Sequence, residues 1–261
     1  LYPFIYVAAA SISDSNALVR GEVTLWPVGF TLEAYKATFE FPLLMTSYKN
    51  TVLYTSLGTA VNVLLTAMGA YVLSRKRFYG RKFFSMMILF TMLFNAGLIP
   101  TFLVIKQLSL YNNFWVMIFP SAISGYNLIV MKTFFEQIPL ELEESATIDG
   151  CSEFQTLFRI ILPLSKASLM TIGMFYAVAH WNSFFNALIY LKDASKFPLQ
   201  IKLREIVMLN AMSDELTEGR NVFSESIKYA VIIVATLPIL IVYPFIQKYF
   251  VKGVMIGAVK G

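Results

Sequence analysis

The sequence predicts an all-α integral membrane protein, and three observations lead to that prediction. Hydrophobic residues make up 57% of the 261 residues and charged residues only 14%, whereas soluble domains carry about 25% charged residues. The mean hydropathy is +0.64. Five stretches of 22 to 24 residues contain no Asp or Glu, and each is long enough as a helix to cross a hydrocarbon core of about 30 Å. These features exclude a soluble monomer and a disordered chain.

The predicted spans follow one another along the chain. They cover 1–13 in part, 51–73, 84–105, 114–135, 168–191 and 228–250. Residues 1–13 are too short to cross a bilayer as a helix. We interpret them as the outer part of a first helix whose beginning is absent. A cleaved signal peptide fits less well, because a basic leader and a small-residue cleavage site are missing.

One short segment carries the orientation signal. Five basic residues fall within eight positions, and no acid lies among them: Arg75, Lys76, Arg77, Arg81 and Lys82. Such local density marks a cytoplasmic loop. Counting spans from this loop predicts that both termini are cytoplasmic, together with segments 74–83, 136–167 and 251–261. The outer segments are then 14–50, 106–113 and 192–227.

The remaining composition narrows the classes of function. The net charge is +5, but the only dense basic cluster lies beside a long apolar run, where it indicates membrane topology, and this excludes a nucleic-acid binder. The single cysteine, Cys151, and the single histidine, His180, leave no internal disulfide and predict no metal site. No G-x-x-x-x-G-K-S/T sequence is present, so we expect no ATP site in this chain. All sixteen acidic residues lie outside the five complete spans, which argues against proton or sodium coupling and against a catalytic pair.

Residues 136–167 carry more structure signals than an ordinary loop between spans. Pro139 suits the first turn of a helix, and acidic residues follow it where the helix dipole favours negative charge. Gly150 suits the left-handed conformation after a helix, and Ser152 begins a capping-box pattern for a second helix. Pro163 ends or kinks that helix before the next span. The pattern predicts a helix, a glycine turn and a helix, and leaves an ordinary interfacial hairpin open as its role.

The same loop carries a resemblance to a known family. The run Glu144-Ser145-Ala146, then Gly150, then Ile161-Leu162-Pro163 resembles the EAA signature of binding-protein-dependent ABC importer permeases, with a serine in place of the first alanine. The resemblance implies a single permease domain over residues 1–261 with the six-transmembrane-helix fold of type I importers, truncated in its first helix. It also implies that the loop docks on a separate ATPase. The residues with this coupling role would be Glu143, Glu144, Ser145, Ala146, Asp149, Gly150, Leu162 and Pro163.

Further motifs extend the resemblance over the whole chain. Asn95 to Pro100 is similar to a G-x-I-P element of the family, and the terminal Gly257 to Gly261 also fits. Glu22 to Pro27 and Phe30 to Tyr35 are most similar to a subgroup of the maltose-type carbohydrate importers that handles oligosaccharides, such as fragments of alginate, pectin or host glycans. The resemblance implies a bacterial cytoplasmic membrane location and no cofactor on this chain. The implied partners are a second homologous permease, two ATPase subunits that bind ATP and Mg, an extracytoplasmic sugar-binding protein and membrane lipid.

Polar residues within the spans are candidates for a sugar pathway. Sugars need amide and hydroxyl hydrogen bonds and aromatic faces, but polar side chains also join helices in a membrane, so both roles stay open. Packing is the favoured role for Asn62 and for His180. Asn95, Gly97 and Pro100 interrupt the third span and are consistent with a hinge there. The pathway candidates are Asn95, Tyr126, Asn127, Tyr176, His180, Trp181, Asn182 and Asn186.

The C-terminal tail is the last predicted element. Residues 251–261 carry a glycine at every fourth position, which is typical of a frayed end, but the apolar side chains between them favour burial. Permeases of the maltose type place such a tail between the two ATPase subunits. The residues that we expect at that interface are Met255, Ile256, Gly257, Lys260 and Gly261.

Two other classes of function compete with an ATP-driven permease. A secondary transporter or channel would work without an ATPase, and the EAA pattern would then be coincidence. An intramembrane enzyme would need a catalytic pair, which the spans lack. Copurification of an ATPase with this chain separates the first class from a permease.

Overall fold

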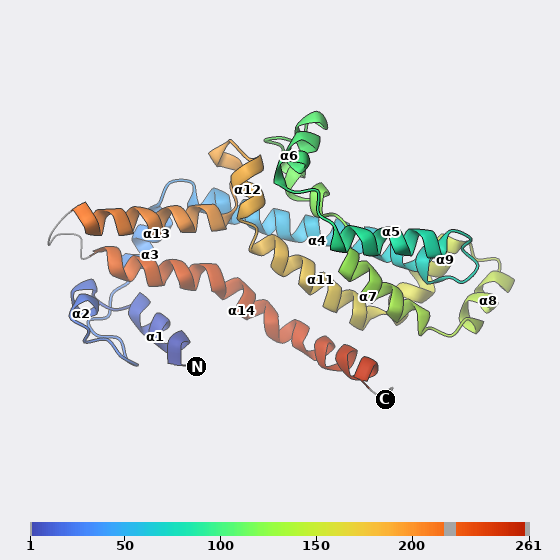
Figure 1. Cartoon of the computed structure of the whole chain (residues 1–261). Coiled ribbons are helices and arrows are strands. Elements are labelled where there is room, and N and C mark those ends of the chain that lie inside the picture. The colour runs from blue at the N-terminus through green and yellow to red at the C-terminus, as the bar shows by residue number, and fades with distance from the viewer. Residues whose placement is uncertain (1, 217–222, 259–261) are drawn as a thin grey trace. The chain divides into compact units, whose positions relative to one another are not determined.

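The computed structural model describes the backbone of residues 2–216 and 223–258, and every regular element in those two ranges is helical (Figure 1). The predicted all-α class is therefore confirmed. The chain forms two compact units. Unit 1 comprises Leu1–Val52 and Asn182–Tyr243, and unit 2 comprises Leu53–Trp181 and Pro244–Gly261.

Two single helices in the described part of the chain are long and apolar enough to cross a membrane. Helix α4, Leu44–Ser74, contains the predicted span 51–73 without a break. Helix α14, Phe223–Ala258, contains the predicted span 228–250, and its candidate membrane segment is Glu225–Val242. Three bent helix pairs raise the number of candidate spans to as many as five.

Span 84–105 is not one straight helix, and it breaks where the sequence predicts an interruption. It divides into α5, Arg81–Leu93, and α6, Leu98–Gln107, which are bent by 118°. The side chain of Asn95 accepts a hydrogen bond at 2.9 Å from the backbone N–H two residues later, which competes with the helical ladder. Pro100 falls in the first turn of α6, where its missing N–H is not needed. The predicted interruption is present, as a sharp break between two helices.

Span 114–135 is also divided, although the sequence predicts one continuous span. It begins as two short 3-10 turns, η1 (Phe114–Met117) and η2 (Phe119–Ser121), and continues as α7, Gly125–Glu136, after a bend of 55°. Ser124 caps α7 through its side chain. A serine at this position satisfies a free N–H of the first turn, so the chain begins a new helix here.

Span 168–191 is divided as well, although the sequence predicts one continuous span. Helix α11, Lys166–Trp181, ends at the boundary of unit 2, and α12, Phe185–Tyr190, begins in unit 1. Asn182 and Ser183 lie between them. Short polar side chains of this kind bond readily to nearby backbone groups outside a helix, which favours an interruption.

Unit 2 is built around α7. Helices α5 and α11 both pack against it (Figure 1). The core contains fully buried side chains from three helices and from the segment after α8, among them Ala70, Met131, Phe135, Ile161 and Ile172. Because Ile161 belongs to this core, the core holds the predicted coupling loop 136–167 against the rest of unit 2.

Unit 1 contains the short helices α1 (Tyr2–Ser11), α2 (Ser15–Val19), α3 (Glu33–Glu40) and η4 (Ala194–Lys196), and the longer α13 (Leu199–Leu216). The described residues of the predicted outer loop 192–227 are therefore largely helical. Polar side chains at the start of α4 hold the beginning of α13 in place. Thr51 Oγ1 accepts a hydrogen bond from the Leu199 N–H at 2.7 Å, and Asn50 Nδ2 donates to the Ser195 carbonyl, also at 2.7 Å.

The predicted tail does not leave the last span at residue 250. Helix α14 continues to Ala258, so the backbone of Met255, Ile256 and Gly257 is helical. Lys260 and Gly261 lie outside the described residues.

Candidate functional site

The segment after α7 folds as a helix, a glycine turn and a helix, as predicted. Helix α8, Glu141–Ile148, is followed by Gly150 with φ 79°. The Gly150 N–H donates to the Thr147 carbonyl at 3.1 Å, and the next N–H donates to the Ala146 carbonyl at 2.9 Å. These two bonds form a Schellman motif. A Cβ on Gly150 would meet no atom within 4 Å beyond its chain neighbours, so glycine is needed here for its conformation and not for space.

The second helix begins with the predicted capping box. In α9, Glu153–Thr156, the Ser152 side chain accepts from the Gln155 N–H, and the Gln155 side chain accepts from the Ser152 N–H at 2.8 Å. Pro139 differs from its prediction, because α8 begins at Glu141 and the proline precedes the helix.

A π-helical turn, η3 (Leu157–Ile161), continues α9 and leads into α10, Leu162–Leu164. The chain then bends by 87° into α11. Pro163 lies immediately before this bend, where the sequence predicts a break. The glycine turn and the bend together hold α8 and α9 at one end of unit 2.

Helix α8 has two different faces. Glu143 and Ala146 are buried, with 6% and 3% of their surfaces exposed. Glu144, Ser145 and Ile148 are exposed, and Ile148 exposes 86% of its surface. The outer face is therefore available to another subunit, whereas the inner face attaches the helix to unit 2. Of the other predicted coupling residues, Asp149, Gly150 and Pro163 are exposed and Leu162 is half-buried.

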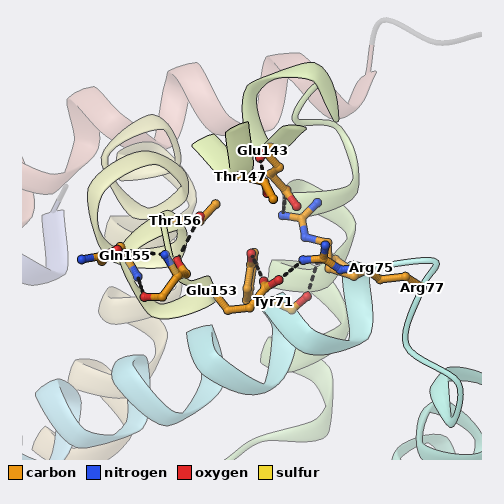
Figure 2. Close-up of polar contacts among 10 residues, drawn as sticks. Tyr71, Arg75, Arg77, Glu143, Thr147, Glu153, Gln155 and Thr156 are labelled. Carbon is orange, nitrogen blue, oxygen red and sulfur yellow. Dashed lines mark hydrogen bonds and ion pairs between the residues drawn. The ribbon is translucent and has the colours of Figure 1, made fainter. Parts of the chain in front are cut away.

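Glu143 attaches α8 to the end of α4 (Figure 2). Its Oε1 lies 2.5 Å from Arg75 Nη2, and only 6% and 8% of the Arg75 and Glu143 side chains are exposed. The guanidinium also lies over the Tyr71 ring, 4.7 Å from Cζ to the ring centroid. Burial raises the pKa of Glu143, and the positive charges of Arg75 and Arg77 offset part of that rise.

A second set of contacts attaches α9 to the same region. Tyr71 donates its hydroxyl hydrogen to Glu153 Oε2 at 2.8 Å, and Arg77 pairs with the other oxygen of that carboxylate (Figure 2). Arg81 pairs with Glu136 at the end of α7. We call these pairs, together with Arg75–Glu143, the anchor network.

The anchor network was not predicted from the sequence, where the basic segment served only as a topology signal. Complementary charge could have revealed it. Segment 75–82 holds five basic residues and no acid, whereas 136–153 holds six acidic residues and no base. Their pairing places segments 74–83 and 136–167 at the same end of unit 2.

Six of the pathway candidates belong to unit 2, and four of these are buried: Asn127, Tyr176, His180 and Trp181. Tyr176 is buried, and its hydroxyl lies 2.7 Å from Thr66 Oγ1 and accepts from the Ser124 N–H at 2.9 Å. His180 Nε2 lies 3.1 Å from Asn62 Nδ2, which also donates to the Ser121 carbonyl at 3.2 Å. Asn127 is buried as well. Tyr176 and His180 therefore join α11 to α4.

The close approach of α4 and α11 depends on Gly58. A Cβ on this residue would lie 2.5 Å from His180 Nε2, which is far inside van der Waals contact. Gly58, Asn62 and Thr66 recur at every fourth position and so share one face of α4. That face meets His180 and Tyr176 of α11.

The eight pathway candidates are divided between the two units. Trp181 is buried, whereas Asn95 and Tyr126 are exposed in unit 2. Asn182 and Asn186 belong to unit 1, where the first is exposed and the second half-buried.

Comparison with known proteins identifies the family. The family described as "Binding-protein-dependent transport system inner membrane component" matches residues 42–256. The chain belongs to this family. It is the membrane permease of a binding-protein-dependent ABC importer, as the EAA-like loop indicates, and not a secondary transporter or channel.

Individual relatives support the same assignment. The "Polygalacturonan/rhamnogalacturonan transport system permease protein YtcP" of Bacillus subtilis (strain 168) is 45% identical over 99% of this chain and 92% of its own length. "Protein LplC" of the same bacterium is 45% identical over the whole chain and 90% of its own length. A chain from the "Crystal structure of a bacterial ABC transporter involved in the import of the acidic polysaccharide alginate" superposes with a TM-score of 0.88 at 37% identity. The match covers 96% of this chain and 90% of that one.

Proposed function

We propose that this permease is one of two homologous membrane subunits of an importer that moves an oligosaccharide into a bacterial cell by alternating access. The names of relatives at 45% and 37% identity, which refer to pectic polysaccharides and to alginate, support a sugar polymer fragment as substrate. An extracytoplasmic binding protein delivers the substrate. A separate ATPase supplies the free energy and holds the ATP and Mg.

The outer face of α8 is the observation that supports coupling to an ATPase. Ile148 exposes 86% of its surface beside the exposed Glu144. Covering an isoleucine this exposed with a partner subunit lowers the free energy of the complex. The inner face is tied to α4 by the buried Arg75–Glu143 pair. A movement of the docked ATPase would therefore displace α8 and the end of α4 together.

Substitutions on the outer face test this docking. Ile148→Ser and Glu144→Lys should lower the amount of ATPase that copurifies with the assembled permease, by about tenfold for Ile148→Ser because a buried aliphatic anchor is lost. Val19→Ser is the matched control, since Val19 is 65% exposed but lies in the predicted outer segment 14–50. Normal ATPase retention and normal uptake in both α8 variants would refute docking through this face.

Reconstitution tests the substrate class. The complete complex in liposomes, supplied with its binding protein, should hydrolyse ATP faster when a bound oligosaccharide is present and should accumulate that oligosaccharide. Accumulation without the ATPase would favour a secondary transporter. Failure of every oligosaccharide to stimulate hydrolysis or uptake would refute the proposal.

The proposed orientation places segments 74–83 and 136–167 in the cytoplasm. Single cysteines at Lys82 and Lys196 in a Cys151→Ser background report it in intact cells. An impermeant thiol reagent should label Lys196→Cys and not Lys82→Cys. The reverse pattern would place the anchor network outside.

The C-terminal end of α14 and the residues after it form a second proposed contact with the ATPase. Deleting residues 254–261 should preserve membrane insertion and weaken assembly or substrate-stimulated hydrolysis. A deletion variant that assembles, hydrolyses ATP and transports normally would leave coupling to α8 alone.

A further inference from the structure

Unit 1 contains a cavity of about 450 Å³ between the segment after α11, α13 and the first half of α14. This volume lies within the range of about 300–1,000 Å³ that is typical of small-molecule sites. Its α14 wall is mostly apolar and runs from Val231 to Ile239, inside the candidate membrane segment Glu225–Val242. Asn182, Gln200 and Arg204 contribute polar groups to the lining. In Figure 1, α13 runs beside the first half of α14.

Arg204 is the charged group of this cavity. Its guanidinium stacks on Phe184, which also lines the cavity, with Cζ 4.6 Å from the ring centroid. Lys202, two residues earlier on α13, is buried and pairs with Glu205 at 2.7 Å. No carboxylate among the described side chains pairs with Arg204. The two neighbouring cations therefore differ, because Lys202 is neutralised by Glu205 whereas Arg204 lines the cavity.

Arg204 is exposed and lines the cavity, so a ligand from the predicted outer side can reach its guanidinium. The planar guanidinium fork matches a carboxylate through two parallel hydrogen bonds. Phe184 keeps the fork in place and offers an apolar face. The amides of Asn182 and Gln200 are groups that bond to sugar hydroxyls. The lining thus combines one cation, amides and an aromatic ring, which are the groups that an acidic sugar requires.

We propose that this cavity holds a uronic acid unit of the oligosaccharide during import and that Arg204 binds its carboxylate. The proposal rests on the proposed function, because it takes the transported molecule to be an oligosaccharide. It narrows the substrate to an acidic one and assigns the recognition of charge to this subunit.

Chemical rescue of a cysteine variant tests the proposal. Uptake of trigalacturonate and of neutral arabinotriose is measured in the reconstituted complex that carries Cys151→Ser. Arg204→Cys should lower trigalacturonate uptake by about tenfold, as expected when charge-assisted hydrogen bonds to a carboxylate are lost, and leave arabinotriose uptake unchanged. A thiol reagent that adds an ammonium group should restore trigalacturonate uptake, and one that adds only a methylthio group should not. Lys196→Cys, which also removes one positive charge from segment 192–227, is the matched control and should transport both sugars normally.

Each other outcome has a defined meaning. Normal trigalacturonate uptake by Arg204→Cys, or equal rescue by both reagents, would overturn the role of its charge. Equal loss for both sugars would also overturn it, since Arg204 would then serve a lipid phosphate or the fold. If Arg204→Cys does not assemble, Arg204→Gln is assayed in the same way, and full trigalacturonate uptake would again overturn the proposal. A parent complex that transports arabinotriose but not trigalacturonate refutes only the acidic site, whereas one that transports no oligosaccharide refutes the proposed function itself.

Discussion

Unit 2 joins its helices by two kinds of polar contact, and both involve α4. Within the span, Asn62 and Thr66 bond to neutral partners, namely His180 and the hydroxyl of Tyr176. At the end of α4, Arg75 pairs with the carboxylate of Glu143. Neutral groups thus join helices where lipid surrounds the protein, and charges join them where α4 ends.

The difference follows from the cost of desolvation. A neutral hydrogen bond between helices contributes only about 0.6 kcal/mol on average in a membrane, but neither partner is expensive to bury. A charge is expensive at the same depth. The anchor network can use charges because it lies beyond the span, and Arg75–Glu143 is its most buried member. The two contacts should therefore respond very differently to substitution.

The largest effect is expected at Arg75. Arg75→Gln leaves Glu143 buried without its partner, which should lower the free energy of unfolding by about 3–5 kcal/mol. Arg77→Gln is the control, because both partners of Arg77–Glu153 are about 60% exposed and such pairs contribute less than about 1 kcal/mol. Denaturant titration of the purified chain in detergent measures both. Equal losses of unfolding free energy in the two variants would show that burial does not make the Arg75–Glu143 pair more important than Arg77–Glu153.

A smaller effect is expected where α4 and α11 meet. Gly58→Ala places a Cβ 2.5 Å from His180 Nε2, and the resulting overpacking should cost about 1–3 kcal/mol. Gly173→Ala is the matched control, since its Cβ would lie 3.6 Å from Val63 Cγ2, an ordinary van der Waals contact. The same titration should show no loss for Gly173→Ala. A stable Gly58→Ala variant would mean that the helices separate easily here.

The glycine turn of the coupling segment should show a conformational effect. Gly150→Ala meets no atom within 4 Å beyond its chain neighbours but must keep φ at 79°, which costs about 1–2 kcal/mol for a residue with a Cβ. Gly150→Asn should lose less, because asparagine tolerates the left-handed region. We expect ATPase coupling to fall in the same order, measured as substrate-stimulated hydrolysis. Equal substrate-stimulated hydrolysis in the two variants would mean that coupling does not depend on the left-handed conformation of this turn.

The smallest effect is expected at Thr66. Thr66→Val removes the contact with the Tyr176 hydroxyl and should cost about 0.6 kcal/mol. Thr59→Val provides the comparison, because the buried Thr59 Oγ1 has no partner among the described residues. That change should be neutral or slightly stabilising. A loss at Thr59 as large as that at Thr66 would mean that the hydroxyl bond to Tyr176 contributes nothing.

Local chemistry in the sequence was sufficient for the two unbroken spans and for the coupling segment. An apolar run without acids predicts a membrane helix wherever it occurs, as in α4 and α14. The Schellman turn at Gly150 and the capping box at Ser152 depend on residues within a few positions of each other. Both were predictable because their hydrogen bonds close within the same segment.

The partners of the polar residues were decided by tertiary structure alone. Glu143 and Glu144 are adjacent in sequence and identical in type, yet one is buried against Arg75 and the other is exposed. Arg204 and Lys202 differ in the same way within unit 1. Position on a helix face determines which side chain can meet another helix. The partner itself is known only when the second helix is packed in place. For this reason the sequence predicted where charged groups lie along the chain, whereas their pairing required the fold.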